Sequence, residues 1–99
     1  MGSIRSSAYD SAEFTVANAA SNYDVREEES DAFSNVPVSV RTLIRTDQPV
    51  TIKLNSTANP GITINLQDNP LVIDWQEIKD IFITNASGST ANIKLILVE

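Results

Sequence analysis

Hydrophobic and polar residues alternate along most of the chain from residue 36 onward, which is the pattern of strands with one buried and one solvated face. The alternation is clearest in residues 38–45, 50–55 and 62–66. β-Branched residues are abundant in these stretches and suit the pleated surface of a sheet. Clusters of Asn, Asp, Pro and Gly separate the stretches and supply turn chemistry. We therefore expect short antiparallel strands joined by tight turns.

The N-terminal third is less regular. Residues 12–19 alternate around Phe14 and Val16 and predict one more strand, whereas residues 22–33 begin like a strand and then become acidic. Residues 1–11 are small and polar, which predicts a flexible arm, and the first three of them resemble a cloning remnant.

Only residues 74–81 have a helical signal, namely the spacing of a capping box. The stretch is so short that we expect a turn or an irregular link instead. The predicted fold class is all-β: a single-domain antiparallel β-sandwich over residues 12–99, jelly-roll-like, with seven or eight strands. An extended N-terminal arm over residues 1–11 precedes it.

The last two expected strands are apolar on both faces. Ile81 and Ile83 point to one side of their strand while Ile78 and Phe82 point to the other, and residues 92–98 have the same character. A strand of an isolated sandwich should have one polar face, so the second apolar face needs cover. The N-terminal segment, a neighbouring subunit or a central place in a small barrel can each supply it. Because each buried aliphatic side chain contributes roughly 1.5–3 kcal/mol, we favour the neighbouring subunit.

We therefore predict nine residues that contact other subunits. In the N-terminal segment they are Phe14, Val16, Tyr23 and Val25, and on the second apolar face they are Trp75, Ile81, Ile83, Ile96 and Val98. Trp75 is the only tryptophan in the chain. An exposed tryptophan can stack on a sugar ring, but the apolar neighbours of Trp75 in sequence favour a core position or a subunit contact.

Charge and composition exclude several function classes. The net charge is −6, and residues 1–35 hold seven acidic residues against two basic ones. An acidic chain is repelled by phosphate backbones and anionic bilayers, so we expect neither nucleic acid nor membrane as a partner. No apolar run is long enough to cross a bilayer or to act as a signal peptide, which predicts synthesis in a cytoplasm. Without cysteine or histidine, Ser-His-Asp and Cys-His catalysis within this chain is impossible.

Carboxylates offer two weaker candidate sites. Residues 27–31 could chelate calcium, but they lack the ligand spacing of a calcium loop and are better explained as a solvated loop. A carboxylate pair for glycoside hydrolysis could come from Asp68, Asp74, Glu77 and Asp80. Nothing in the sequence fixes their separation, so we predict no catalytic, metal or cofactor site.

Two further patterns involve turns and surface charges. Asn55 and Asn85 each begin a glycosylation acceptor pattern, which turn chemistry explains equally well. Arg41, Arg45 and Lys53 lie on polar strand faces and could bind an acidic partner segment, such as residues 27–29 of an adjacent copy. Ordinary surface charges remain the default explanation.

The stretches SNVPVSVRTLIRTDQPVTIKLNS (34–56) and IFITNASGSTANIKLILV (81–98) resemble small all-β structural proteins of tailed bacteriophages. The resemblance lies in short Ser/Thr/Asn-rich turns and in the terminal apolar hairpin. It implies a non-enzymatic role in a symmetric assembly, often a trimer. The expected function is that of a virion structural protein, a capsid decoration or cementing subunit.

The expected partners are further copies of the chain, with a trimer favoured, and/or a major capsid protein, and the expected location is the virion. The alternative is a carbohydrate- or receptor-binding β-sandwich module of a fibre or tail. A small enzyme that uses Asp/Glu pairs and an engineered β-protein are more distant alternatives.

Overall fold

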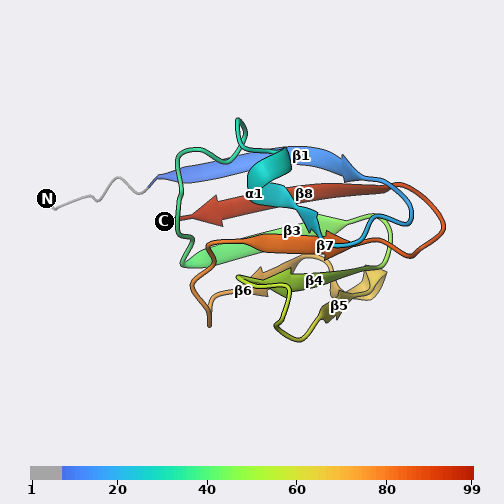
Figure 1. Ribbon diagram of the computed structural model, residues 1–99. Coiled ribbons are helices and arrows are strands. Elements are labelled where there is room, and N and C mark those ends of the chain that lie inside the picture. Colours follow the sequence, from blue (N-terminus) through green and yellow to red (C-terminus); the bar gives the residue numbers. More distant parts are fainter. Residues whose placement is uncertain (1–7) are drawn as a thin grey trace, which may run out of the picture.

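The computed structural model of the protein describes residues 8–99, which form two four-stranded antiparallel sheets packed face to face (Figure 1). Sheet A has the strand order β1-β8-β3-β6 and sheet B the order β2-β7-β4-β5. Sheet A consists of β1 (Tyr9–Val16), β8 (Ala91–Val98), β3 (Arg41–Thr46) and β6 (Leu71–Ile73). Sheet B consists of β2 (Tyr23–Asp24), β7 (Ile81–Thr84), β4 (Val50–Leu54) and β5 (Ile62–Ile64). The predicted all-β antiparallel sandwich is confirmed.

Helical structure in residues 8–99 is limited to one short α-helix, α1 (Val25–Glu28), and one 3-10 turn, η1 (Leu66–Asp68). The side chain of Asp24 accepts a hydrogen bond of 3.2 Å from the backbone N–H of Glu27 and so caps α1. The sequence pattern did not predict α1, because four residues are too few to give a helical period. Across the described part of the chain, no helix has the length and apolar character needed to cross a membrane.

The link between β6 and β7 is irregular, as its short capping-box pattern led us to expect. A single bridge between Ser39 and Ile78 ties it to the segment before β3. The Ser39 hydroxyl is fully buried and donates to the carbonyl oxygen of Arg41 at 2.7 Å. These bonds end the alternation expected for residues 38–45, so β3 begins only at Arg41 and Val40 is exposed.

The hydrophobic core lies between the two sheets and follows the period of two. Every second residue of β8 points inward, from Ala91 to Leu97, and each is at most 1 % exposed. Ile52 and Leu54 of β4 face them from sheet B, together with the inward residues of β7. The apolar residues that alternate along these strands in the sequence are therefore the residues that form this core.

The N-terminal segment forms an edge strand of sheet A. Strand β1 pairs with β8 along its whole length, from Tyr9 opposite Val98 to Val16 opposite Ala91. The expected arm over residues 1–11 is therefore wrong for residues 9–11, and residues 1–7 lie outside the described part. The cause is tertiary: the edge of β8 offers backbone partners to a polar segment that has little strand propensity of its own.

A buried carboxylate fixes β1 to the loop that follows α1. Asp10 is 4 % exposed and accepts hydrogen bonds from the backbone N–H groups of Asn35 and Val36, both at 3.0 Å. It also accepts a 3.0 Å bond from Nδ2 of Asn35. Three donors satisfy the buried charge, which would otherwise cost several kcal/mol to desolvate.

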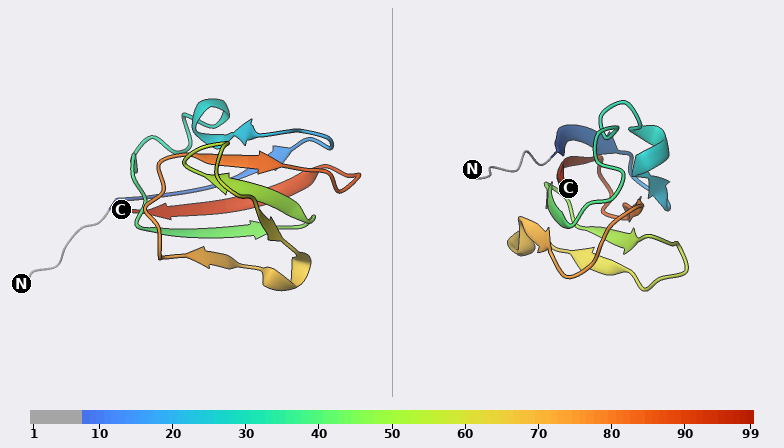
Figure 2. Two further views of the ribbon diagram at one scale, coloured as in Figure 1. Left: turned by 60° about the horizontal axis from the view of Figure 1, so that its bottom comes forward. Right: turned by 90° about the vertical axis from the view of Figure 1, so that its left-hand side faces the viewer.

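The segment after β2 closes one open edge of the sandwich. Figure 2 shows this segment beside β1 and β2, and its side chains Val25, Phe33 and Val36 are buried in the hydrophobic core. Arg26 holds this segment in place, because its guanidinium donates to the carbonyl oxygens of Lys79, Phe33 and Pro37 at 2.7–3.1 Å. Self-cover by the N-terminal third thus protects the core at its edge, and it leaves the outer face of sheet A open.

Candidate interaction surface

Most of the nine predicted contact residues are buried inside a single subunit. Phe14, Val16, Val25, Ile81 and Ile83 are all at most 8 % exposed. The assignment of Ile81 and Ile83 to an uncovered outer face is wrong, because strand pairing places them beside Leu54 and Ile52, whose side chains point into the core.

Tyr23 belongs to the same interior group and is half-buried. Its ring stacks on Phe14 with centroids 6.1 Å apart, and its hydroxyl donates to a carboxylate oxygen of Glu29. Burial, followed by this bond to Glu29, raises the pKa of the Tyr23 phenol well above its usual value. Phe14 and Tyr23 are therefore structural within one subunit.

Three of the nine predicted residues are accessible. Ile96 and Val98 lie half-buried on the outer face of sheet A, as the alternation of β8 requires. Trp75 follows β6 in the irregular link and is 64 % exposed. The structure therefore does not gather the nine residues on one surface, and it places Trp75 outside the strands that carry Ile96 and Val98.

Strand register brings further apolar residues beside Ile96 and Val98. Ile96 pairs with Leu43 of β3, which in turn pairs with Val72 of β6, and Val98 pairs with Tyr9 of β1. Paired residues point to the same face with their Cβ atoms about 4.5–5.5 Å apart, so they form one surface. We call Tyr9, Leu43, Val72, Ile96 and Val98 the sheet A patch. Tyr9 is 65 % exposed and Val72 37 %.

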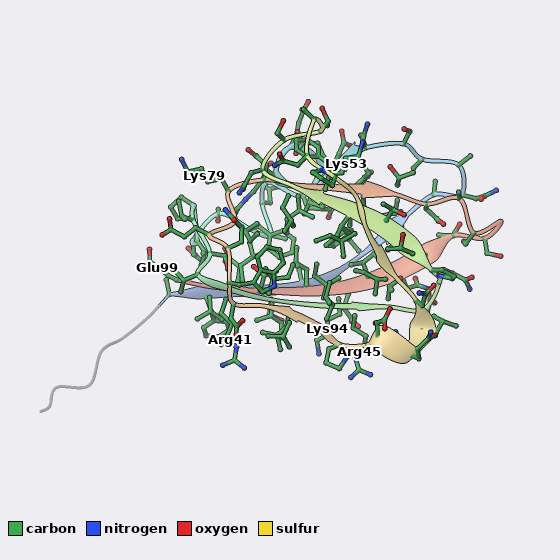
Figure 3. All side chains as sticks on the ribbon, turned by 90° about the horizontal axis from the view of Figure 1, so that it is seen from below. Arg41, Arg45, Lys53, Lys79, Lys94 and Glu99 are labelled. Atoms are coloured by element: carbon green, nitrogen blue, oxygen red, sulfur yellow. The ribbon has the colours of Figure 1, made fainter. Side chains whose placement is uncertain are left out.

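Three cations lie on the same outer face as the sheet A patch. Arg41, Arg45 and Lys94 project from the side of sheet A that faces away from sheet B, whereas Lys53 and Lys79 lie on the opposite side (Figure 3). Arg45 and Lys94 are direct cross-strand partners, as are Arg41 and Val98. Like charges in such a pair repel each other, but Glu13 of β1 is the other cross-strand partner of Lys94 and offsets this repulsion. We call Arg41, Arg45 and Lys94 the sheet A cations.

A hollow of about 560 Å³ borders the sheet A cations at one end of sheet A. Its lining includes Arg45, Lys94 and the carboxylates Glu13 and Asp47. Asp47 accepts bonds from the backbone N–H and from Nδ2 of Asn92, at 2.7 and 2.6 Å. These bonds lower the pKa of the Asp47 carboxyl, so Asp47 serves as a fixed acceptor that ties β8 to the turn after β3.

The outer face of sheet B has a different character. Its central cross-strand pairs join Thr51 to both Thr63 and Thr84, and they join Lys53 to Phe82. The hydroxyls of Thr51 and Thr63 lie 3.3 Å apart. Phe82 is half-buried and stands between polar neighbours on its two partner strands. Sheet B therefore presents hydroxyl groups to solvent where sheet A presents aliphatic groups.

The acidic residues considered for calcium binding and for glycoside hydrolysis do not form a site. Glu27 and Glu28 are exposed on α1, whereas Glu29 accepts the hydroxyl of Tyr23. Among residues 8–99, no three of the Asp and Glu side chains come close enough to hold a metal ion. The four carboxylates considered for glycoside hydrolysis, Asp68, Asp74, Glu77 and Asp80, line neither the hollow on sheet A nor the pocket beside Trp75.

The two glycosylation patterns lie at turns with defined backbone roles. Asn55 has a positive φ of 68° and accepts the backbone N–H of Lys79 at 2.7 Å. Asn85 is fully buried, and its amide donates to the carbonyl oxygens of Val16 and Ser89. Turn and loop architecture therefore accounts for both asparagines.

Comparisons of the chain with family models, with curated proteins and with solved structures find no match. Sequence reasoning found the outward side of β8 but missed Tyr9, Leu43 and Val72. Leu43 carried a usable signal, because it occupies an expected solvent-facing position of an alternating strand.

Proposed function

We propose that the protein is a virion structural subunit of the capsid decoration or cementing class, which acts by contact and carries out no reaction. The observation that carries this proposal is the sheet A patch, a continuous apolar strip across all four strands of one outer face. Contiguous exposed apolar surface on a small domain typically marks an interaction site. The resemblance of residues 34–56 and 81–98 to small phage structural proteins favours a particle as the setting.

The proposed fold subtype is a jelly roll. The antiparallel pairs β1–β8, β2–β7, β3–β6 and β4–β5 support it, because they are the pairs of one long hairpin. Rolling such a hairpin adds contacts between β8 and β3 and between β7 and β4, and both pairs are present. Jelly rolls are frequent in viral capsid proteins, although they also occur in lectins, so this subtype is compatible with the proposal without requiring it.

The proposed partners are further copies of the chain, in a trimer, and/or a major capsid protein. Charge complementarity favours a second copy: the sheet A cations need an acidic surface, and α1 with the following loop holds Glu27, Glu28 and Asp31 exposed. This helix packs beside β2 and β7 of the other sheet. A contact between two different surfaces of the same chain closes into a ring when its rotation permits, and three copies make a small ring.

The experiment is a measurement of molar mass by light scattering over a range of protein concentrations. We expect a discrete multimer for the wild type and for a chain without residues 1–7. The double variant Leu43→Thr/Ile96→Thr places β-branched residues, which suit a strand, at both positions but removes apolar area from the sheet A patch. Because each aliphatic side chain contributes roughly 1.5–3 kcal/mol when buried, its association constant should fall by about a hundredfold or more.

The matched control is Leu66→Thr, which removes an exposed apolar side chain from η1, outside both the sheet A patch and α1. It should leave the molar mass unchanged. High salt should weaken the wild-type multimer, because it screens the sheet A cations from an acidic partner surface. A wild type that stays monomeric at all concentrations, or a control that dissociates as readily as the double variant, would refute association through sheet A.

A further inference from the structure

The exposed ring of Trp75 lies against a pocket of about 370 Å³ at the edge of the sandwich formed by β5 and β6. Its apolar part comes from Leu54, Pro60 and Ile62, and its polar part consists of the amides Asn55, Asn59 and Gln76. No charged side chain is among these lining residues. We call this site the Trp75 pocket. Its volume falls within the usual range for small-molecule sites, which is about 300–1,000 Å³.

Hydrogen bonds hold the walls of the Trp75 pocket together before any ligand arrives. Nδ2 of Asn55 donates to the carbonyl oxygen of Glu77 at 2.9 Å, while its Oδ1 accepts from Lys79 at 2.7 Å. These bonds clamp the turn after β4 to the link that carries Trp75. Asn59 donates its own Nδ2 to the carbonyl oxygen of Leu54 at 2.7 Å, which fixes the plane of that amide. A preformed site loses little conformational entropy on binding.

We propose that the Trp75 pocket binds a neutral sugar ring. One side of a pyranose is a surface of C–H groups, and the negative face of an indole attracts such groups when they stack on it. The other side carries hydroxyl groups, which pair with amides that both donate and accept, as Asn59 and Gln76 do. The indole, the aliphatic floor and the amide rim of this pocket supply these two kinds of contact.

The lining argues against other occupants. A nucleotide or an acidic sugar would need a cation in the pocket, and none of the seven lining residues carries a charge. A purely aliphatic ligand would cut off from water the hydrogen-bonding capacity that the rim amides do not use within the protein, at a cost of about 1–3 kcal/mol for each buried group. A proline-rich peptide could stack on Trp75, and it is therefore included as an outcome of the test.

Trp75 reports on its own pocket because it is the only tryptophan of the chain. The probes are methyl glycosides of glucose, galactose, mannose and N-acetylglucosamine, titrated to about 50 mM, since single sugar rings are expected to bind with millimolar affinity. We expect at least one glycoside to shift the tryptophan emission in a saturable way. Backbone amide NMR shifts in the same titration should be confined to the lining residues, such as Leu54, Ile62 and Gln76.

Three variants test the assignment by NMR. Trp75→Ala should weaken binding by about tenfold or more, and Trp75→Phe should retain part of it, because a smaller aromatic ring still stacks. The matched control is Tyr9→Ala, which removes an equally exposed aromatic residue from the sheet A patch. Tyr9→Ala should leave sugar binding unchanged, and Trp75→Ala should leave the multimer intact, so the two proposals fail separately.

The proposal is overturned if no glycoside changes the emission or the amide shifts. It is also overturned if Trp75→Ala, with wild-type amide shifts elsewhere, binds a glycoside as tightly as the wild type does. Saturable binding of a polyproline peptide in the absence of any glycoside response would assign the pocket to peptide and refute the sugar. Loss of the multimer in Trp75→Ala would assign Trp75 to a subunit contact instead.

Discussion

The outer faces of the two sheets differ although the same alternation builds both. Sheet A turns the aliphatic groups of Leu43 and Ile96 outward, whereas sheet B turns the hydroxyl groups of Thr51 and Thr63 outward. A threonine on an outer face satisfies both the strand geometry and water. An aliphatic residue there contributes to stability only when something covers it. The comparison shows that the uncovered aliphatic surface lies on sheet A and not on the terminal hairpin as a whole.

The two terminal strands contribute unequally to this difference. β7 turns its isoleucines Ile81 and Ile83 into the core and keeps Phe82 as its single large apolar residue on the outside. β8 turns an isoleucine and a valine outward in addition to the aliphatic residues that it buries. The number of apolar residues in β7 and β8 therefore overstates the apolar surface that lacks cover. The inward side chains of β7 already pack against sheet A.

The largest expected effect separates the inward from the outward isoleucines. Ile83→Ala should lower the free energy of unfolding by about 2–5 kcal/mol, because it opens a cavity between the sheets. Ile96→Ala should cost much less in a monomeric sample, because the side chain is only half-buried. Urea unfolding, at a protein concentration too low for association, measures the free energy of unfolding of both variants. Equal costs for the two variants would contradict the assignment of faces in β7 and β8.

An intermediate effect tests whether the cations of sheet A serve contact rather than the stability of the subunit. Arg45→Thr removes one cross-strand neighbour of Lys94, which keeps Glu13 of β1 as its other partner, so the free energy of unfolding of the isolated subunit should change by less than about 1 kcal/mol. The same variant should associate more weakly and with less dependence on salt. Thermal unfolding and light scattering report the two quantities. Lys53→Thr on sheet B is the matched control, and it should not weaken association.

The smallest expected effect is a pH dependence at the end of sheet A. The bonds from Asn92 lower the pKa of Asp47 in the folded state, so their contribution to stability is present above the ordinary aspartate pKa. It is lost as the pH falls through the lowered pKa of the folded protein. Asp47→Asn should therefore flatten part of the decline in urea midpoint below about pH 5. An unchanged decline would show that the bonds between Asp47 and Asn92 do not contribute to the acid sensitivity.

The alternation of the sequence was sufficient to predict the fold class. It marked the strands at residues 50–55, 62–66 and 92–98 closely, because a period of two is a local property of each strand. It failed for the N-terminal boundary, where Tyr9, Asp10 and Ser11 form a strand only because β8 provides an edge to pair with. It also missed α1, whose start depends on a single cap by Asp24.

The candidate sites were less accessible to sequence reasoning. Residues of the sheet A patch are distant in sequence, and only the register of four strands places Tyr9, Leu43 and Val72 beside the end of β8. Trp75 has apolar neighbours in sequence and was expected to be covered, yet the irregular link turns it outward. Its pocket depends on the turn after β4, which lies some twenty residues earlier in the chain.

The sequence alone determined that this chain forms an antiparallel β-sandwich and that its terminal strands carry more apolar residues than one face requires. Alternation separates the residues of a strand into two sets but does not say which set faces the opposite sheet. Only the tertiary structure decided that Ile81 and Ile83 point inward while Ile96 and Val98 point outward. The reason is that this choice depends on which sheet each strand joins, and strand pairing between distant segments is a property of the whole chain.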